Sequence, residues 1–142
     1  MRGLLLLCAA VSLGCGGAPP APSPPSAGAP PAAAVQPGTP GATDVSGLKA
    51  AMDAGSVVLI DVRTPGEYGE GHVPGAVNIP ISELEGRLSE LEPHKAGALH
   101  LICASGGRSG RATDLLASKG WAQPINVEGG TRAWIAAGLP VE

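Results

Sequence analysis

Cys103 is the residue whose surroundings in the sequence most clearly favour chemistry. It is followed by the run Ala104-Ser105-Gly106-Gly107-Arg108-Ser109. Adjacent glycines let a loop curl so that several backbone N–H groups converge on one point, and such a nest attracts negative charge. A helix that begins near Ser109 would add the positive end of its dipole, and Arg108 would add a full charge. All of these favour the thiolate, which is the nucleophilic form of cysteine.

The residues alone leave two interpretations of this cysteine open. A free cysteine is among the most frequently buried residue types, so Cys103 could be a small apolar core residue. The glycines and the arginine that follow it favour a reactive thiol instead. The other cysteines, Cys8 and Cys15, lie near the N-terminus. If Cys15 is acylated after removal of the residues before it, Cys103 is the one free thiol and no intramolecular disulfide can form.

Other polar residues have mainly structural interpretations. Asp61 closes an apolar run and Arg63 follows two residues later. We expect both to support the structure by bonding the loop, with Arg63 pairing with a nearby carboxylate such as Glu67 or Glu70. His72 is expected to make a structural hydrogen bond in a turn. The histidines and the thiol have no spacing typical of metal ligands, so we predict neither a metal nor a cofactor.

The elements that must position these residues alternate along the chain from Thr43. Short apolar runs predict strands at residues 57–60, 76–79, 99–103 and 125–127. Apolar residues at helical spacing predict helices at residues 45–54, 81–91, 108–119 and 131–137. Strands and helices in alternation favour an α/β fold. We expect a compact single domain with a short parallel β-sheet covered by helices on both faces.

The N-terminal residues are typical of an export signal. Residues 1–15 combine Arg2, an apolar stretch and small residues around Cys15, and they are too short to span a bilayer stably. The segment Val11-Ser12-Leu13-Gly14-Cys15 resembles a bacterial lipobox, with Ser12 where leucine is usual. We therefore predict a signal peptide with lipidation at Cys15. A signal peptide cleaved without lipidation and a cytoplasmic chain are the alternatives.

Residues 16–42 are typical of a disordered linker. They hold more than half of the 15 prolines of the chain and no charged residue. Such a composition cannot bury enough surface to offset chain entropy, and it favours an extended polyproline conformation. Residues 43–142 would then form the one folded domain. A lipid at Cys15 would hold that domain on the periplasmic side of a bacterial cell envelope.

Composition and charge restrict the partners. The formal net charge is −3 and the chain has no run of basic residues, so nucleic acid is not an expected partner. Aromatic residues make up 2% of the chain, so the core must be built mainly from Val, Leu, Ile and Ala, which suits buried parallel strands. We expect small molecules and, through an N-terminal lipid, a membrane as partners, and the domain is predicted to be a monomer.

Several short motifs resemble the rhodanese homology domain in their order and approximate spacing. They are Asp61-Val62-Arg63, Glu67-Tyr68, Gly71-His72-Val73-Pro74-Gly75-Ala76, Asn78-Ile79-Pro80, the loop from Cys103 to Ser109, and Gly129-Gly130 with Ala133-Trp134. The resemblance covers residues 43–142 and implies the rhodanese fold. It also implies that Cys103 takes a sulfane sulfur from a donor, holds it as a persulfide, and passes it to cyanide or a thiol. Residues 104–109 would then hold the loaded sulfur.

Loop length and loop charge narrow this implied function. Four residues separate Cys103 from Arg108, whereas the related dual-specificity cell-cycle phosphatases resemble Cys-x5-Arg. The resemblance associates the shorter loop with sulfur rather than with phosphate. The loop interior is uncharged, where the better-known thiosulfate enzymes often place extra cations. We therefore expect thiosulfate or a persulfide as donor, and the uncharged loop suits a persulfide at least as well. The alternatives are a non-catalytic rhodanese-fold module that docks a partner protein or captures a persulfide, and a thiol-exchange protein that needs an external thiol.

Overall fold

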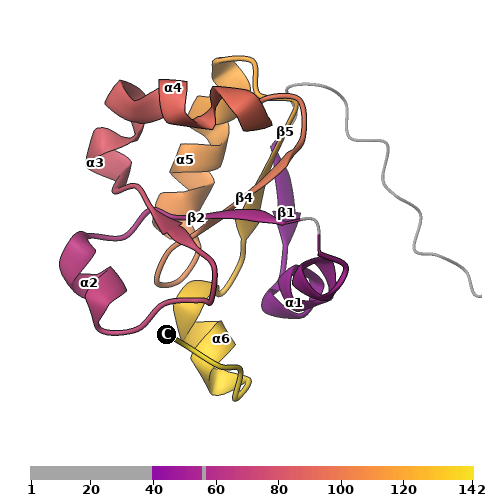
Figure 1. Cartoon of the computed structure of the whole chain (residues 1–142), viewed down its shortest axis with the longest axis vertical. Coiled ribbons are helices and arrows are strands. Elements are labelled where there is room, and N and C mark those ends of the chain that lie inside the picture. Colours follow the sequence, from indigo (N-terminus) through magenta and orange to yellow (C-terminus); the bar gives the residue numbers. More distant parts are fainter. Residues whose placement is uncertain (1–39, 56) are drawn as a thin grey trace, which may run out of the picture. The chain divides into compact units, whose positions relative to one another are not determined.

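The computed structural model describes residues 40–55 and 57–142 (Figure 1). The predicted signal peptide, the lipidation site Cys15 and the linker up to residue 39 lie outside the described residues. The described part contains a five-stranded parallel sheet in the order β1-β5-β4-β2-β3. Its strands are β1 (Gly41–Thr43), β2 (Val58–Asp61), β3 (Val77–Asn78), β4 (Ala98–Ile102) and β5 (Gln123–Val127). No helix in this part is long and apolar enough to cross a bilayer.

Six α-helices connect and follow these strands. They are α1 (Val45–Asp53), α2 (Pro65–Gly69), α3 (Ile81–Leu84), α4 (Leu88–Leu91), α5 (Gly107–Ser118) and α6 (Gly130–Ala136). The single helix predicted over residues 81–91 is interrupted by a 3-10 turn at Glu85–Arg87. Gly86 lies at the centre of this turn, and glycine is a weak helix former. The sequence prediction for this segment was therefore right in its apolar face and wrong in its continuity.

Two elements of the fold were not predicted. β1 begins at Gly41, so the sheet includes two positions that had been assigned to the linker. Its strand is short and has no apolar run, and its pairing with β5 defines it. α2 was missed because five residues are too few to show a helical period. It is defined by its N-terminus, where Thr64 and Glu67 form a capping box and Pro65 takes the first helical position.

Side chains of β4 divide the core between the two faces of the sheet. Leu101 packs in a cluster with apolar side chains of α3, α4 and α5, whereas Ile102 packs in a second cluster with α1 and α6. Successive residues of a strand point to opposite faces, so the two clusters lie on opposite sides of the sheet. Trp134 of α6 is buried in the second cluster. The predicted parallel α/β sheet with helices on both faces is confirmed.

The carboxyl ends of the three central strands bring the polar motifs together. Parallel register pairs Asp61 at the end of β2 with Ile102 of β4, and Leu101 of β4 with Asn126 of β5. Cys103 therefore follows β4 at the same edge where the turn after β5 begins. This edge is where ligands bind in open α/β sheets.

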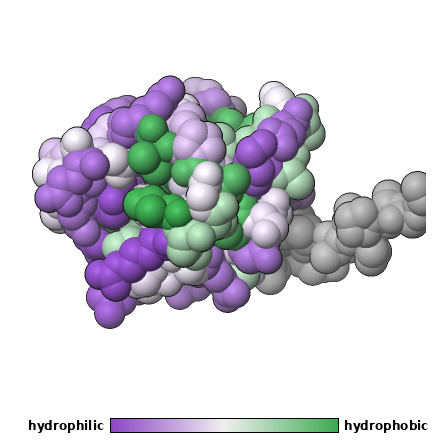
Figure 2. Space-filling model, turned by 90° about the horizontal axis from the view of Figure 1, so that it is seen from below, coloured by the Kyte–Doolittle hydropathy of each residue, from purple (hydrophilic) through white to green (hydrophobic). Residues whose placement is uncertain are grey.

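The C-terminal residues pair with the loop that follows α2. His72 donates its backbone N–H to the carbonyl of Glu142, and Glu142 donates to the carbonyl of His72, both at 2.9 Å. Figure 2 shows apolar surface gathered near the middle of the face seen from below, among polar residues. Ile135 of α6 and Val141 are among the exposed large apolar side chains of the described part.

Candidate active site

The sulfur of Cys103 lies against the loop that joins β4 to α5. The residue is 1% exposed, and the backbone N–H of Gly106 donates to Sγ at 3.1 Å. The hydroxyl of Ser109, in the first turns of α5, lies 3.4 Å from Sγ. Gly106 has a φ of +102°, a left-handed conformation that places its N–H toward the sulfur at little cost only because it is glycine. The loop is therefore built to surround a sulfur atom with donors.

The ionisation of Cys103 is set by two opposing effects. Burial raises the pKa of the thiol, because a buried thiolate loses its hydration. Hydrogen bonds from the Ser109 hydroxyl and from the backbone N–H groups of Ser109, Ser105 and Gly106 act in the opposite direction. These bonds outweigh burial and hold the pKa of Cys103 below its usual value. The site therefore enriches the nucleophilic thiolate.

The other residues predicted around the sulfur form the rest of this loop. Gly106 is buried, Ala104 is partly buried, and Ser105 and Gly107 are exposed. α5 begins at Gly107 and runs for 12 residues, so the positive end of its dipole lies at the loop. The structure thus brings the predicted residues 104–109 together around Cys103.

α6 holds the loop from its other side. The backbone N–H of Thr131 donates to the carbonyl of Cys103 at 2.8 Å, and the Thr131 hydroxyl donates to the same oxygen at 3.2 Å. The N–H of Arg132 donates to the carbonyl of Ala104 at 3.1 Å. Gly130 makes this contact possible, since a Cβ there would lie 2.2 Å from the Cys103 carbonyl oxygen. The turn at Gly129-Gly130 therefore brings the start of α6 into contact with the reactive loop.

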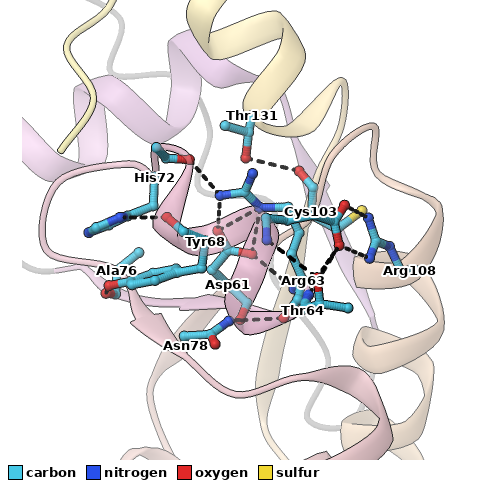
Figure 3. Close-up of polar contacts among 12 residues, drawn as sticks. Asp61, Arg63, Thr64, Tyr68, His72, Ala76, Asn78, Cys103, Arg108 and Thr131 are labelled. Atoms are coloured by element: carbon cyan, nitrogen blue, oxygen red, sulfur yellow. Dashed lines mark hydrogen bonds and ion pairs between the residues drawn. The ribbon is translucent and has the colours of Figure 1, made fainter.

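Arg108 lies beside Cys103 and is paired with a carboxylate from α2 (Figure 3). Its guanidinium donates two hydrogen bonds to Glu67, at 2.7 Å and 2.6 Å. The hydrogen bond from Arg108 is the largest cause that lowers the pKa of Glu67 to about 2, assisted by the capping bonds from Thr64. Both side chains are about one third exposed. Arg108 is therefore present at the loop as predicted, but its charge is balanced by Glu67.

Arg63 pairs with Asp61 and not with Glu67 or Glu70, so that expectation was wrong. The guanidinium donates to Oδ2 of Asp61 at 2.9 Å and 2.7 Å, and to the carbonyl of Gly71 at 2.8 Å. The chain turns immediately after β2, which places Arg63 next to the carboxylate two positions before it. Both side chains are buried. The pair connects the end of β2 to the loop after α2, which agrees with the structural support predicted for both residues.

His72 and Tyr68 form part of the same supporting layer. Their rings stack with centroids 3.7 Å apart, and Nδ1 of His72 lies 3.1 Å from the carbonyl oxygen of Tyr68. Tyr68 donates its hydroxyl to the carbonyl of Ala76 at 2.6 Å (Figure 3). The structural hydrogen bond predicted for His72 is confirmed. Among the described residues, no group of three or more His, Cys, Asp or Glu side chains is arranged to hold a metal.

Asn126 and Thr131 are site residues that sequence reasoning missed. Oδ1 of Asn126 lies 2.6 Å from the hydroxyl of Ser109. Thr131 binds the Cys103 carbonyl, as described above. The available signal was weak: a polar residue inside the apolar run of β5, and a hydroxyl directly after two glycines. Neither can be assigned to the cysteine loop without knowing that β5 lies next to β4.

The described domain matches a known protein family. The model of the rhodanese-like domain family matches residues 44–137. A sulfurtransferase of Allochromatium vinosum is 35% identical over 89 residues, which cover 63% of this chain and 81% of that protein. Human thiosulfate:glutathione sulfurtransferase is 37% identical over 101 residues, covering 62% of this chain and 87% of that protein. Other relatives are longer: the match spans 42% of Bacillus subtilis YrkF, a putative sulfur carrier protein.

A solved structure has the same fold. The crystal structure of a rhodanese-related protein from Thermoplasma volcanium superposes with a TM-score of 0.64 and 34% identity. The superposition covers 72% of this chain and 97% of that one. The similarity therefore extends over nearly the whole of the smaller protein.

Proposed function

The chain belongs to the rhodanese-like domain family, and from this premise we propose that Cys103 carries a sulfane sulfur as a persulfide. Relatives named as sulfurtransferases support sulfur transfer in general. The observation that carries the proposal is the pair of donors at Sγ, the Gly106 N–H and the Ser109 hydroxyl at the start of α5. Donors that stabilise the thiolate before reaction can stabilise the outer sulfur of the persulfide after it.

The proposed transfer takes two displacement steps. In the first, the Cys103 thiolate attacks the sulfane sulfur of thiosulfate or of an organic persulfide. A new S–S bond forms on Cys103, the S–S bond of the donor breaks, and sulfite or a thiolate leaves with the electron pair. In the second step, cyanide or a thiolate attacks the outer sulfur of the persulfide. The S–S bond on Cys103 breaks, thiocyanate or a new persulfide leaves, and the thiolate is restored.

The pairing of Arg108 with Glu67 supports a donor of low charge. Two hydrogen bonds from the guanidinium go to the carboxylate, so a thiosulfate dianion must compete with Glu67 for this cation. A persulfide of a small thiol or of a protein carries at most one charge on the reacting sulfur and does not need the guanidinium. We propose a persulfide as the preferred donor and thiosulfate as a poorer one.

Replacing the sulfur atom tests the mechanism directly. We expect Cys103→Ala to abolish thiocyanate formation from cyanide with either donor, while circular dichroism and thermal unfolding of the full chain remain near those of the parent. Cys15→Ala is the matched control, because it removes another thiol from outside residues 43–142 and should retain activity. Activity retained in Cys103→Ala would refute the proposed carrier.

The same protein distinguishes an enzyme from a non-catalytic persulfide-binding module. After incubation with a persulfide donor, intact mass spectrometry should show a gain of one sulfur atom that Cys103→Ala lacks. Adding cyanide should remove this mass and release thiocyanate repeatedly in an enzyme. A sulfur that loads but is not released by cyanide or by a thiol would favour the binding module.

We also propose that a lipid at Cys15 tethers the domain to a membrane of the bacterial envelope. The support is the lipobox-like segment that ends at Cys15 and the proline-rich residues after it. Intact mass of the protein purified from membranes should show acyl chains, and Cys15→Ala should remove them and release the protein to the soluble fraction. A mature mass without acyl chains would contradict this proposal and leave the sulfur chemistry untouched.

A further inference from the structure

The hydroxyl of Ser109 is shared among more groups than its one proton can serve. Ser109 is fully buried, and its Oγ lies 3.4 Å from Cys103 Sγ, 3.1 Å from the Gly106 carbonyl oxygen and 2.6 Å from Oδ1 of Asn126. All three neighbours accept hydrogen bonds, and a hydroxyl can donate only one full bond. Whether the sulfur receives this proton therefore depends on the competing acceptors.

The orientation of the Asn126 amide decides this competition. With Oδ1 facing Ser109, the contact at 2.6 Å can form only if Ser109 donates to Asn126, because an amide oxygen has no hydrogen. With the amide reversed, Nδ2 donates to Oγ and leaves the Ser109 proton for the sulfur. Both ends of an amide are nearly the same size, so the side chain can occupy this space either way. Within residues 40–55 and 57–142, the contact with Ser109 is the only side-chain hydrogen bond of Asn126.

We propose that Asn126 is a positioning residue that sets the ionisation of Cys103 through the Ser109 hydroxyl. With the thiol, the amide oxygen takes the Ser109 proton. With the thiolate, the amide turns, Nδ2 donates to Oγ, and Ser109 donates to Sγ. The inference rests on the reactive Cys103 of the proposed function, but it concerns the proton on sulfur and needs no sulfur donor.

The surrounding charges stay constant in this comparison. The loop is flanked by Arg108 of α5 and its partner Glu67 of α2, and by the Asp61–Arg63 pair at the end of β2. Glu128 and Arg132 lie on either side of the Gly129-Gly130 turn that contacts the loop. None of these side chains takes part in the contact between Ser109 and Asn126, so variants at position 126 leave them in place.

Two replacements of Asn126 separate proton positioning from simple packing. Asn126→Asp keeps the shape but can only accept the Ser109 proton, whereas Asn126→Leu fills a similar volume and leaves that proton for the sulfur. The readout is the rate at which iodoacetamide alkylates the Cys103 peptide of the full chain, followed by mass spectrometry as pH is varied. We expect Asn126→Asp to slow alkylation near neutral pH about tenfold, because a higher pKa of Cys103 leaves less of the thiol ionised. Asn126→Leu should stay within about threefold of the parent rate.

Repeating the replacements of Asn126 in a Ser109→Ala protein shows whether their effect on Cys103 passes through the Ser109 hydroxyl. Ser109→Ala should itself slow alkylation, and in that background Asp and Asn at position 126 should differ by much less than in the parent. Equal slowing by Asn126→Asp and Asn126→Leu would indicate a packing role and overturn the proposal. A full Asp effect retained without the Ser109 hydroxyl would show direct action of the charge and overturn it as well. If the parent protein transferred no sulfur while these alkylation results held, the proposed function would be contradicted and the role of Asn126 would stand.

Discussion

At the scale of single residues, the reactive sulfur depends on donors that are mostly backbone N–H groups. A backbone N–H group is present whatever side chain the residue carries. The loop favours negative charge because its glycines let these N–H groups face the sulfur and because α5 begins there. The ordinary way to stabilise a thiolate, a nearby cation, is present as Arg108 but is balanced by Glu67. Selectivity for the donor is therefore expected to depend on that carboxylate.

Replacing Glu67 tests this dependence. Glu67→Gln removes the charge that competes for Arg108 and keeps an oxygen for the bond from the Thr64 N–H. Because the pair is about one third exposed, its coupling is expected to be about 1 kcal/mol. We therefore expect the KM for thiosulfate to fall roughly fivefold, with kcat/KM for an uncharged persulfide donor unchanged.

Glu70→Gln provides the matched control for this experiment. Glu70 is the exposed C-cap residue of the same helix, so the variant removes the same charge without touching Arg108. Its KM for thiosulfate should remain at the parent value. If both variants lowered the KM equally, net charge near α2 and not the pairing of Arg108 would determine the selectivity.

At the scale of elements, the site depends on how closely α6 approaches the loop after β4. Thr131 and Arg132 bind the carbonyls of Cys103 and Ala104, and this approach leaves no room for a side chain at Gly130. The supporting layer below the loop is equally local, because the buried Asp61–Arg63 pair links the end of β2 to the residues after α2. Small changes in these contacts are expected to move the sulfur relative to its donors.

Gly130→Ala tests the approach of α6. Its φ is +57°, and the new Cβ would also lie 2.7 Å from the carbonyl carbon of Ala104, so the loop must shift. Gly75→Ala is the control, because Gly75 also has a left-handed φ of +75° but has no atom within 4 Å of the added Cβ. We expect Gly75→Ala to cost about 1 kcal/mol of unfolding free energy and to retain activity.

For Gly130→Ala we expect a loss of unfolding free energy about 2 kcal/mol larger than for the control, together with loss of sulfur transfer. Chemical denaturation and the thiocyanate assay measure the two effects. Equal losses in the two variants would mean that backbone conformation alone, and not the contact with the loop, restricts residue 130.

At the scale of the whole molecule, the core contains one titratable side chain that the site does not use. His100 of β4 is buried, and its Nδ1 has no hydrogen-bond partner in the described part of the chain. Burial lowers the pKa of His100 below 6.5, because the charged imidazolium loses its hydration. Below this pH His100 binds a proton more readily in the unfolded chain than in the folded domain. The free energy of unfolding therefore decreases as the pH is lowered.

We therefore expect the unfolding free energy to decrease as pH falls below about 6.5, before the Glu67 pair is affected. Glu67 has a lowered pKa, so its contribution is present above pH 4.5 and is lost as pH falls toward 2. His100→Leu should remove the first decrease and keep the second, as measured by urea denaturation across this pH range. The exposed His94 is the matched control, and His94→Leu should leave both decreases in place. A first decrease that persists in His100→Leu would assign it to another group.

By itself, the sequence determined the α/β class, the parallel sheet, the helices on both faces and the loop after Cys103. These follow from local signals: apolar runs such as residues 57–60, helical spacing such as that in residues 108–119, and glycines next to a cysteine. The resemblance to a family added the sulfur chemistry expected of the thiol. Strand β1 and helix α2 were missed because three or five residues show no period.

Only the tertiary structure decided which side chains meet. Arg63 binds Asp61. Arg108 donates to Glu67, which lies 41 positions earlier in the chain, and Ser109 of α5 donates to Asn126 of β5. None of these pairs is visible in a local pattern, because each depends on the order in which parallel strands place their carboxyl ends along one edge. A hydrogen bond acts only over about 3 Å. The partners of the Cys103 loop are therefore set by strand order and register, which hydrophobic periodicity does not encode.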